Sequence, residues 1–259
     1  MTNNESICKK LRRGIGEFTV KTFNGIRDLL LGRTDWQPTD PIVKEIEARC
    51  FTRTDISDHL KQLFVESIEM KPRLIVELGV RGGESTFVLE RVARLFDIPL
   101  VSVDIEDCSG VSNYPKWHFI KSDDIEFAKQ FQSWANSKNL PQTIDVLFID
   151  TSHIYEHTVQ EIKYWFPLLS STAKVLFHDT NQRLVYLRKD GSIGIGWTNR
   201  GVMRAIEEYF GTRFPENHSF VDIINGWIIK HEPRCNGFTV LTRFFNVNNS
   251  KNENRNFRQ

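Results

Sequence analysis

The sequence has few cysteines, almost no net charge and no long apolar run. Its 259 residues include four cysteines, and none of them stands in C-x-x-C spacing. A zinc cluster and a disulfide framework are therefore both disfavoured, and reduced thiols are expected. The apolar runs are too short to cross a bilayer, and the polar first residues do not resemble a secretory signal. These absences predict a soluble, cytoplasmic protein.

The balance of 34 basic against 33 acidic residues gives no electrostatic reason to expect nucleic acid as a partner. Basic residues gather in residues 8–33, where apolar residues recur at helical spacing. This predicts amphipathic helices in an N-terminal extension, residues 1–54, in which Pro38 and Pro41 mark a loop. One interpretation is that the extension lies at a membrane interface or covers an anionic substrate. The favoured interpretation is that it packs on its own domain or on a partner subunit of a homo-oligomer.

Residues 55–246 are predicted to form one α/β domain, followed by a disordered tail at 247–259 that is rich in asparagine and charge. Apolar runs alternate with helical patterns, which is typical of a Rossmann-like, mostly parallel sheet with helices on both faces. Two final runs joined by Asn236-Gly237 predict a C-terminal antiparallel β-hairpin and bring the total to seven strands. Strands are expected at 74–78, 100–104, 117–121, 146–150, 174–178, 226–230 and 238–243, and helices at 56–70, 85–96, 124–137, 155–169 and 199–210.

The first predicted strand runs into a glycine turn that opens a helix, Glu77-Leu-Gly79-Val-Arg81-Gly-Gly83-Glu-Ser85. Glycine lets the backbone approach a ligand closely, and the free N–H groups at a helix start can receive a negative group. The spacing does not fit the G-x-G-x-x-G fingerprint of dinucleotide-binding proteins. It reads acidic-x-Gly-x-x-x-Gly and resembles the first motif of class I S-adenosylmethionine (SAM) methyltransferases. The alternative is a plain strand-to-helix turn of any α/β protein.

Acidic residues also follow the next strands, and ligands of open parallel sheets bind beyond these strand ends. Asp104 lies 25 positions after Gly79, near the offset expected for a carboxylate that binds a ribose diol. After the third strand, the resemblance implies that Asp123 contacts the adenine amino group. Helix capping by Ser122 or Asp123 explains the same residues equally well. The candidate SAM-binding residues are Glu77, Gly79, Arg81, Gly83, Ser85, Asp104, Ser122, Asp123 and Asp150.

Asp150 and Asp179 end the fourth and fifth predicted strands, which should bring two carboxylates together. Like charges so close need a proton or a cation between them, and hard cations take carboxylate oxygens. The pattern Asp150-x-x-His153, followed later by His178-Asp179-Thr180, resembles macrocin-type sugar O-methyltransferases and cephalosporin-hydroxylase-like proteins. The resemblance implies that Asp150 binds metal, that His153 is a general base, and that positions 178 and 179 complete the metal site. Position 178 departs from that pattern, since the family has an acidic residue there.

The histidine at position 178 leaves three arrangements open. If His178 coordinates, it favours Mn²⁺, Fe²⁺ or Zn²⁺ over Mg²⁺. If it points elsewhere, Asp150, Asp179 and Asn181 form an all-oxygen set for Mg²⁺ or Mn²⁺. In the third arrangement no metal binds, and His178 is simply hydrogen-bonded at a strand end. A neutral imidazole at His153 suits removal of a hydroxyl proton, whereas a capping or surface position is favoured for His157.

Together these features predict a SAM-dependent O-methyltransferase that acts on a small hydroxylated acceptor, by resemblance a sugar or a natural-product scaffold. The connection at 182–198 is long enough for a lid or binding loop, in which Arg183, Tyr186, Arg188 and Trp197 are expected to hold the acceptor. Two rival functions stay open. One is a NAD(P)-dependent oxidoreductase, and the other is a non-catalytic binding or assembly protein.

Overall fold

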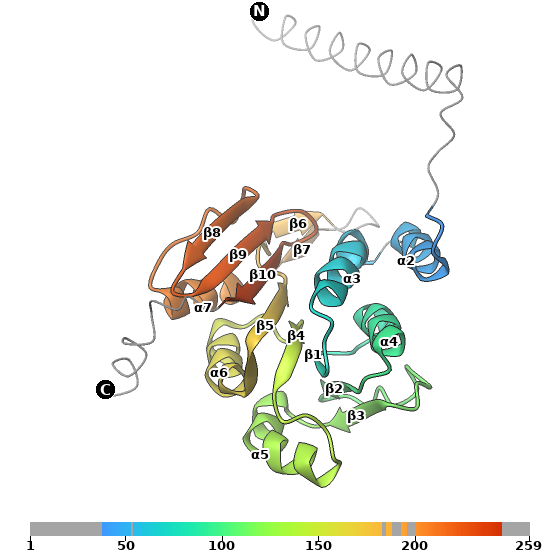
Figure 1. Cartoon of the computed structure of the whole chain (residues 1–259). Coiled ribbons are helices and arrows are strands. Elements are labelled where there is room, and N and C mark those ends of the chain that lie inside the picture. The colour runs from blue at the N-terminus through green and yellow to red at the C-terminus, as the bar shows by residue number, and fades with distance from the viewer. Residues whose placement is uncertain (1–37, 53, 183–184, 188–192, 196–199, 245–259) are drawn as a thin grey trace, which may run out of the picture. The chain divides into compact units, whose positions relative to one another are not determined.

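The computed structural model describes residues 38–52, 54–182, 185–187, 193–195 and 200–244 (Figure 1). The chain divides into a unit of residues 1–44 and a unit of residues 45–259. The helices predicted within 8–33 and the tail predicted at 247–259 lie outside the described residues. The predicted domain boundaries near residues 54 and 246 stay predictions. None of the described helices is long and apolar enough to cross a membrane.

A helix occupies the stretch where the two prolines predict a loop. This helix, α2 (Pro41–Phe51), begins at a proline. Proline fits the first helical position because its missing N–H would have no partner there and its φ is already helical. The carboxylate of Asp40 accepts hydrogen bonds from the N–H groups of Ile42 and Val43, at 2.8 and 3.2 Å. The loop prediction was therefore wrong, since Pro41 starts a helix at this position.

The unit of residues 45–259 is built on an eight-stranded sheet in the order β3-β2-β1-β4-β5-β10-β9-β8. The first five strands in that order run parallel to one another, and the last three are antiparallel. The strands are β1 (Ile75–Leu78), β2 (Leu100–Asp104), β3 (Trp117–Lys121), β4 (Ile144–Ile149), β5 (Leu169–His178), β8 (Phe220–Ile224), β9 (Trp227–Glu232) and β10 (Phe238–Arg243).

The prediction of seven strands was wrong by one, because β8 was not foreseen. This edge strand exposes Val221 and Ile223, so its sequence shows no buried alternation. It forms through backbone pairing with β9. A separate two-stranded antiparallel sheet, β6 (Val185–Leu187) and β7 (Ile193–Ile195), lies within the predicted loop at 182–198. The side chains of Arg183, Tyr186, Arg188 and Trp197, predicted to hold an acceptor, lie outside the described part.

The strand order determines where the helices lie. The chain moves from β1 outward through α4 (Glu84–Phe96) to β2, then returns through α5 (Asp124–Ser137) to β4 and moves the other way through α6 (Tyr155–Trp165) to β5. Right-handed crossovers in opposite directions place their helices on opposite faces of the sheet. Accordingly α4 packs with α3 (Leu60–Glu69), whereas α6 packs with α5 and with α7 (Gly201–Phe210) (Figure 1). The order reverses between β1 and β4, which makes this crevice the expected ligand site.

Two predicted helices are shorter than expected. The helix predicted at 155–169 ends at Trp165 and continues as the 3-10 turn η2 (Phe166–Leu168). Pro167 ends the α-helix because it lacks an N–H and its ring clashes with the preceding turn. The helix predicted at 56–70 begins with the 3-10 turn η1 (Ser57–His59) before α3.

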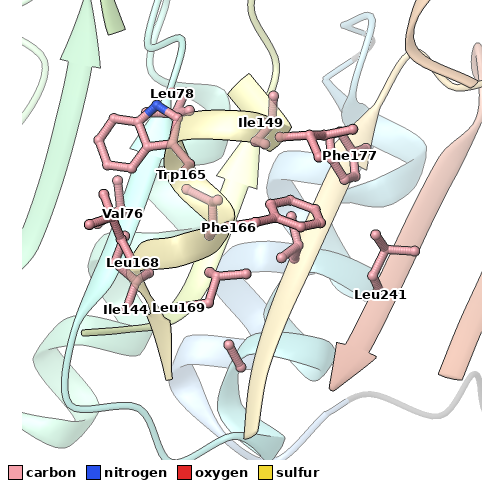
Figure 2. Close-up of a cluster of buried hydrophobic side chains, with 14 of the residues drawn as sticks. Val76, Leu78, Ile144, Ile149, Trp165, Phe166, Leu168, Leu169, Phe177 and Leu241 are labelled. Carbon is pink, nitrogen blue, oxygen red and sulfur yellow. The ribbon is translucent and has the colours of Figure 1, made fainter. Parts of the chain in front are cut away.

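The core on the α5–α6–α7 face is centred on an aromatic cluster. Trp165 is fully buried, and its ring lies 5.6 Å from that of Phe131 and 6.2 Å from that of Phe127. Figure 2 shows Trp165 and Phe166 packed over the strands that carry Val76, Ile149 and Phe177. All six residues of β4 are buried. Helices cover both faces of this strand, which explains its nearly continuous apolar sequence.

We predict that Trp165→Ala lowers the free energy of unfolding by about 3–5 kcal/mol, because the missing indole leaves a cavity. Trp165→Phe should cost clearly less, since the indole nitrogen Nε1 has no hydrogen-bond partner to lose. Urea unfolding followed by circular dichroism measures both values, and Trp134→Ala is the control because Trp134 is only partly buried. If both Trp165 variants lost the same free energy of unfolding, the volume of the ring would not explain how Trp165 stabilises the core.

Candidate functional site

The turn after β1 lies directly against the backbone that follows β4. Gly79 has a φ of +87°, and a Cβ at this residue would lie 2.1 Å from the carbonyl oxygen of Asp150. Gly83 has a φ of +79°, and its Cβ would lie 2.3 Å from Cγ1 of Val111. Both positions therefore require glycine for conformation and for space. The N–H of Asp150 donates to the carbonyl of Leu78 at 2.9 Å, so the glycine turn and Asp150 meet at the crevice between β1 and β4.

Glu77 is enclosed beneath this turn. Its carboxylate accepts hydrogen bonds of 2.6–3.0 Å from the hydroxyls of Ser85, Thr86 and Ser102. Burial raises the pKa of Glu77 to about 7, although the hydrogen bonds from Ser102, Ser85 and Thr86 act in the opposite direction. Glu77 and Ser85, both candidates for SAM binding, thus bind each other and join β1, β2 and the start of α4. These two side chains would affect a bound ligand by setting the shape of the turn.

Asp104 organises the other side of the glycine turn. Its Oδ2 accepts hydrogen bonds from the N–H groups of Val80 and Arg81, at 2.7 and 3.0 Å, and its Oδ1 accepts one from Glu106 at 2.9 Å. Partial burial raises the pKa of Asp104, but these bonds from Arg81, Glu106 and Val80 outweigh it and hold the pKa below its usual value. The thiol of Cys108 also interacts with this carboxylate and lowers its pKa further. The Arg81 guanidinium is exposed and pairs with Asp55 at 2.6 Å.

Ser122 and Asp123 act locally at the start of α5. Asp123 is the N-cap residue, and its Oδ1 accepts a hydrogen bond from the N–H of Glu126 at 3.0 Å. The Ser122 hydroxyl donates to the carbonyl of Asp123 at 2.9 Å. The capping interpretation therefore describes these contacts, and the adenine contact at Asp123 stays a prediction.

The strand ends bring Asp150, His153 and Asp179 into one cluster. Nε2 of His153 lies 3.0 Å from Oδ1 of Asp150 and 3.0 Å from Oδ2 of Asp179. Each of the three residues offers one possible ligand atom, and these atoms lie within 4.8 Å of one another. Burial lowers the pKa of His153, but the hydrogen bond to Asp150 and the charge of Asp179 outweigh it and raise the pKa. Nε2 of His153 thus lies within hydrogen-bond distance of both carboxylates.

The backbone at this cluster is strained. His153 and Asp179 have φ values of 59° and 56°, in the left-handed region that non-glycine residues avoid. Such conformations cost on the order of 1 kcal/mol or more each and gather at functional sites. The start of α7 supports the loop, since a Cβ at Gly201 would lie 2.2 Å from the carbonyl oxygen of His153. The two residues whose side chains meet in this cluster therefore both have a strained backbone.

His178 lies beneath the cluster, and its burial is nearly complete. Its Nδ1 lies 3.4 Å from Oδ1 of Asp150 and 3.5 Å from Oδ1 of Asp179. Neither ring nitrogen of His178 has a hydrogen-bond partner, and neither has Oδ1 of Asp179. Burial lowers the pKa of His178, but the charge of Asp150 outweighs it and raises the pKa well above its usual value.

His59 contacts His178 from η1, and sequence analysis did not identify it. The two rings meet edge to face with centroids 5.5 Å apart, and Nε2 of His59 lies 2.8 Å from the carbonyl oxygen of Arg234. Burial, reinforced by the charge of His178, lowers the pKa of His59 to about 4, so its ring is neutral. No motif in the sequence signals this residue, because it reaches the site from an element that precedes the sheet.

Asn181 turns toward the C-terminal hairpin. Its side-chain Nδ2 donates to the carbonyl of Pro233 at 2.9 Å. Gly237, with a φ of +90°, packs so closely that a Cβ would lie 2.3 Å from the Asn181 backbone nitrogen. Within the described residues, no hydrogen bond joins Asn181 to Asp150 or Asp179. Its predicted role as a metal ligand stays a prediction.

A comparison with protein families identifies this part of the chain. Residues 76–180, which include the glycine turn, Asp104, Asp150 and Asp179, match a family model described as a methyltransferase domain. This part of the chain is similar to a methyltransferase domain. The predicted resemblance to class I methyltransferases is confirmed, and so is the Rossmann-like, mostly parallel sheet with a C-terminal antiparallel hairpin.

Solved structures share the fold of this protein at low sequence identity. Cofactor-bound Rv0187 from MTB is 16% identical with a TM-score of 0.51, over 85% of this chain and 96% of that chain. The SAH-bound methyltransferase PaMTH1 from Podospora anserina is 14% identical with a TM-score of 0.50, over 89% and 97%. MycE from the mycinamycin biosynthetic pathway, in complex with Mg, SAH and mycinamycin VI, is 16% identical with a TM-score of 0.50, over 93% and 64%. No curated protein matches the sequence.

Glu77 should make the stability of this protein pH-dependent. Its pKa in the folded state, about 7, lies above the usual 4.5, so its contribution to stability is complete below pH 4.5 and is lost as the pH rises through 7. A shift of this size corresponds to on the order of 2–3 kcal/mol. The free energy of unfolding of wild type minus that of Glu77→Gln should therefore fall between pH 5 and pH 8 in urea titrations. If this difference did not change with pH, the pKa of Glu77 would not be raised in the folded state.

Proposed function

We propose that this protein transfers the methyl group of SAM to a hydroxyl of a small molecule. The observation that carries the proposal is the contact between Gly79 and the backbone of Asp150. This contact puts the glycine turn, where a nucleoside cofactor would bind, beside the Asp150–His153–Asp179 cluster, where an acceptor hydroxyl could be held. The methyltransferase domain supports the reaction class. The choice of oxygen as the acceptor atom follows from the chemistry of the cluster.

The glycine turn and Asp104 fit a bound SAM molecule. Gly79 and Gly83 present backbone without Cβ atoms, and Asp104, which holds the turn in place, would accept a hydrogen bond from a ribose hydroxyl. Asp123 would reach the adenine amino group with the acceptor capacity that capping leaves unused. The PaMTH1 and MycE structures, which share this fold, were solved with SAH bound.

Asp150 and Asp179 fit a divalent cation. Their carboxylates face each other across one imidazole nitrogen, and Oδ1 of Asp179 is buried without a hydrogen-bond partner. A bound cation would supply the Lewis acidity that favours ionisation of an acceptor hydroxyl. Mg²⁺ and Mn²⁺ suit the two carboxylates, and His178, whose Nδ1 lies 3.4 Å from Oδ1 of Asp150, would shift the preference toward Mn²⁺ if it bound the ion.

His153 is the proposed general base. It takes the proton that the acceptor hydroxyl loses as the new O–CH₃ bond forms and the S–CH₃ bond breaks. Its Nε2 is shared by Asp150 and Asp179 in this structure, so it must lose its own proton before it can act. Neutralisation of the two carboxylates by a cation would weaken their hold on that proton and favour the neutral imidazole.

The acceptor is proposed to be a sugar or another hydroxylated natural-product scaffold. The motif spacing around Asp150, His153 and Asp179 supports this, as does the shared fold with MycE, which was solved with mycinamycin VI. The β6–β7 sheet follows Asp179 closely along the chain. The connection at 182–198, which contains this sheet, is where we propose that the acceptor binds.

Calorimetric titration with SAM tests the cofactor. Wild type should bind one SAM molecule, and Asp104→Asn should bind it about 10–100-fold more weakly because a charged acceptor is lost. Asp107→Asn is the matched control, since Asp107 is a nearby exposed carboxylate. Absence of SAM binding to wild type, with and without Mn²⁺ or Mg²⁺, would refute the proposed cofactor. Equal affinities of wild type and Asp104→Asn would refute the role of Asp104.

A screen of hydroxylated acceptors with methyl-labelled SAM tests the reaction. On any acceptor found, His153→Gln should lower kcat by about 10²–10⁴-fold with unchanged affinity for SAM. Asp150→Asn should lower both turnover and its dependence on added Mn²⁺. His218→Gln, at an exposed position, is the control. Unchanged turnover of His153→Gln would remove the proposed base.

A further inference from the structure

A second cluster of one histidine and two carboxylates lies between α5 and α6. Asp124 is the first residue of α5, and His157 and Glu161 stand four residues apart on α6, so they share one face. Nε2 of His157 lies 2.9 Å from Oδ1 of Asp124 and 3.6 Å from Oε1 of Glu161. The predicted capping or surface role of His157 was wrong, because the fold brings α5 against this face of α6.

The two carboxylates of this second cluster are buried and incompletely partnered. Asp124 is 7% exposed and Glu161 is 0% exposed. Oδ2 of Asp124 and Oε2 of Glu161 have no hydrogen-bond partner, and neither has the buried hydroxyl of Thr158. Nε2 of His157 is hydrogen-bonded to Oδ1 of Asp124, whereas Oε1 of Glu161 lies 3.6 Å from the same nitrogen and accepts a hydrogen bond from Thr151. A buried acceptor without a partner is costly, and the cost is larger for a charged group.

The charges of the second cluster balance either with a protonated Glu161, whose pKa burial raises to about 7, or with a bound divalent cation. Among the described residues, no lysine or arginine forms an ion pair with Asp124 or Glu161. Two ionised carboxylates and one imidazolium would leave a net negative charge in a buried place. A divalent cation with a neutral imidazole would cancel the charge of two ionised carboxylates.

We propose that Asp124, His157 and Glu161 form a second divalent-cation site, selective for a transition-metal ion such as Zn²⁺, Co²⁺ or Mn²⁺. Their ligand atoms lie within 4.8 Å of one another. The separations of 2.9 and 3.6 Å match ligand–ligand edges of about 2.8–3.6 Å, which follow from metal–ligand bonds of about 2.0–2.2 Å at octahedral to tetrahedral angles. An imidazole among the ligands favours transition metals over Mg²⁺ and Ca²⁺.

The ion at this second site would act as a structural clamp. The hydroxyl of Thr151 donates to Oε1 of Glu161 at 2.5 Å, an outer contact of the kind that orients metal-binding carboxylates. Thr151 lies between Asp150 and His153 in the loop after β4. The ion would therefore tie α5, α6 and this loop together, whether or not the protein transfers methyl groups.

The test uses full-length protein freed of metal with a chelator and then titrated with Co²⁺. Bound Co²⁺ is counted by elemental analysis after gel filtration and seen by its visible absorption. The variant Asp150→Asn/Asp179→Asn removes the carboxylates of the first cluster. It should keep one Co²⁺ per chain and gain about 5–10 °C in Tm at a 100-fold excess of Co²⁺ over Kd.

Addition of His157→Gln to that double variant should abolish the bound Co²⁺ and the gain in Tm, whereas addition of His218→Gln should change neither. Circular dichroism shows whether each variant is folded, and His157→Gln alone in wild type serves if the triple variant is not, with the loss of one Co²⁺ per chain expected. Loss of all Co²⁺ in the folded double variant, or unchanged Co²⁺ after His157→Gln, would overturn the proposal. SAM binding of wild type is unaffected by either result, so failure of this site is distinguishable from failure of the proposed function.

Discussion

The close approach of Gly79 to the carbonyl oxygen of Asp150 is the constraint on which the rest of the site depends. A Cβ at residue 79 would lie 2.1 Å from that oxygen, so no other residue lets the turn after β1 meet the loop after β4. The same turn is held by Asp104 through two backbone N–H groups and rests on the enclosed Glu77. Close packing of the backbone therefore puts the glycine turn and the Asp150–His153–Asp179 cluster in one crevice.

Where the strand ends and helices meet, several carboxylates lie close together and their negative charges must be compensated. At the first cluster, His153 bridges Asp150 and Asp179 while His178 lies close below. At the second cluster, His157 stands between Asp124 and Glu161. Both clusters leave buried carboxylate oxygens without partners. A cation satisfies oxygens of this kind better than a proton, because it can bind several at once. The left-handed backbone at His153 and Asp179 shows that this arrangement also costs conformational energy.

Much of the fold could be predicted from the sequence, because both faces of the parallel strands are covered and their apolar runs are clear. The positions of β1 and β2 follow from such runs. The edge strand β8 could not be predicted, since pairing with β9 and not burial holds it in place. Pro41 marked a loop in the sequence but begins a helix, because the first helical turn tolerates proline. The position of His59 and the pairing of His157 with Asp124 could not be predicted either, since each depends on contacts between elements distant in sequence.

The sequence by itself determined the strand-to-helix turn with its glycines, the acidic residues at the strand ends, and the resemblance of these patterns to methyltransferases. It could do so because local periodicity and residue type record which positions are buried and which carry charge. Only the tertiary structure decided which side chains share a site: His153 between two aspartates, Asn181 turned to the hairpin, and a second histidine–carboxylate cluster between α5 and α6. These outcomes depend on strand order and helix packing, and neighbouring residues in the sequence do not encode the distances between separate elements.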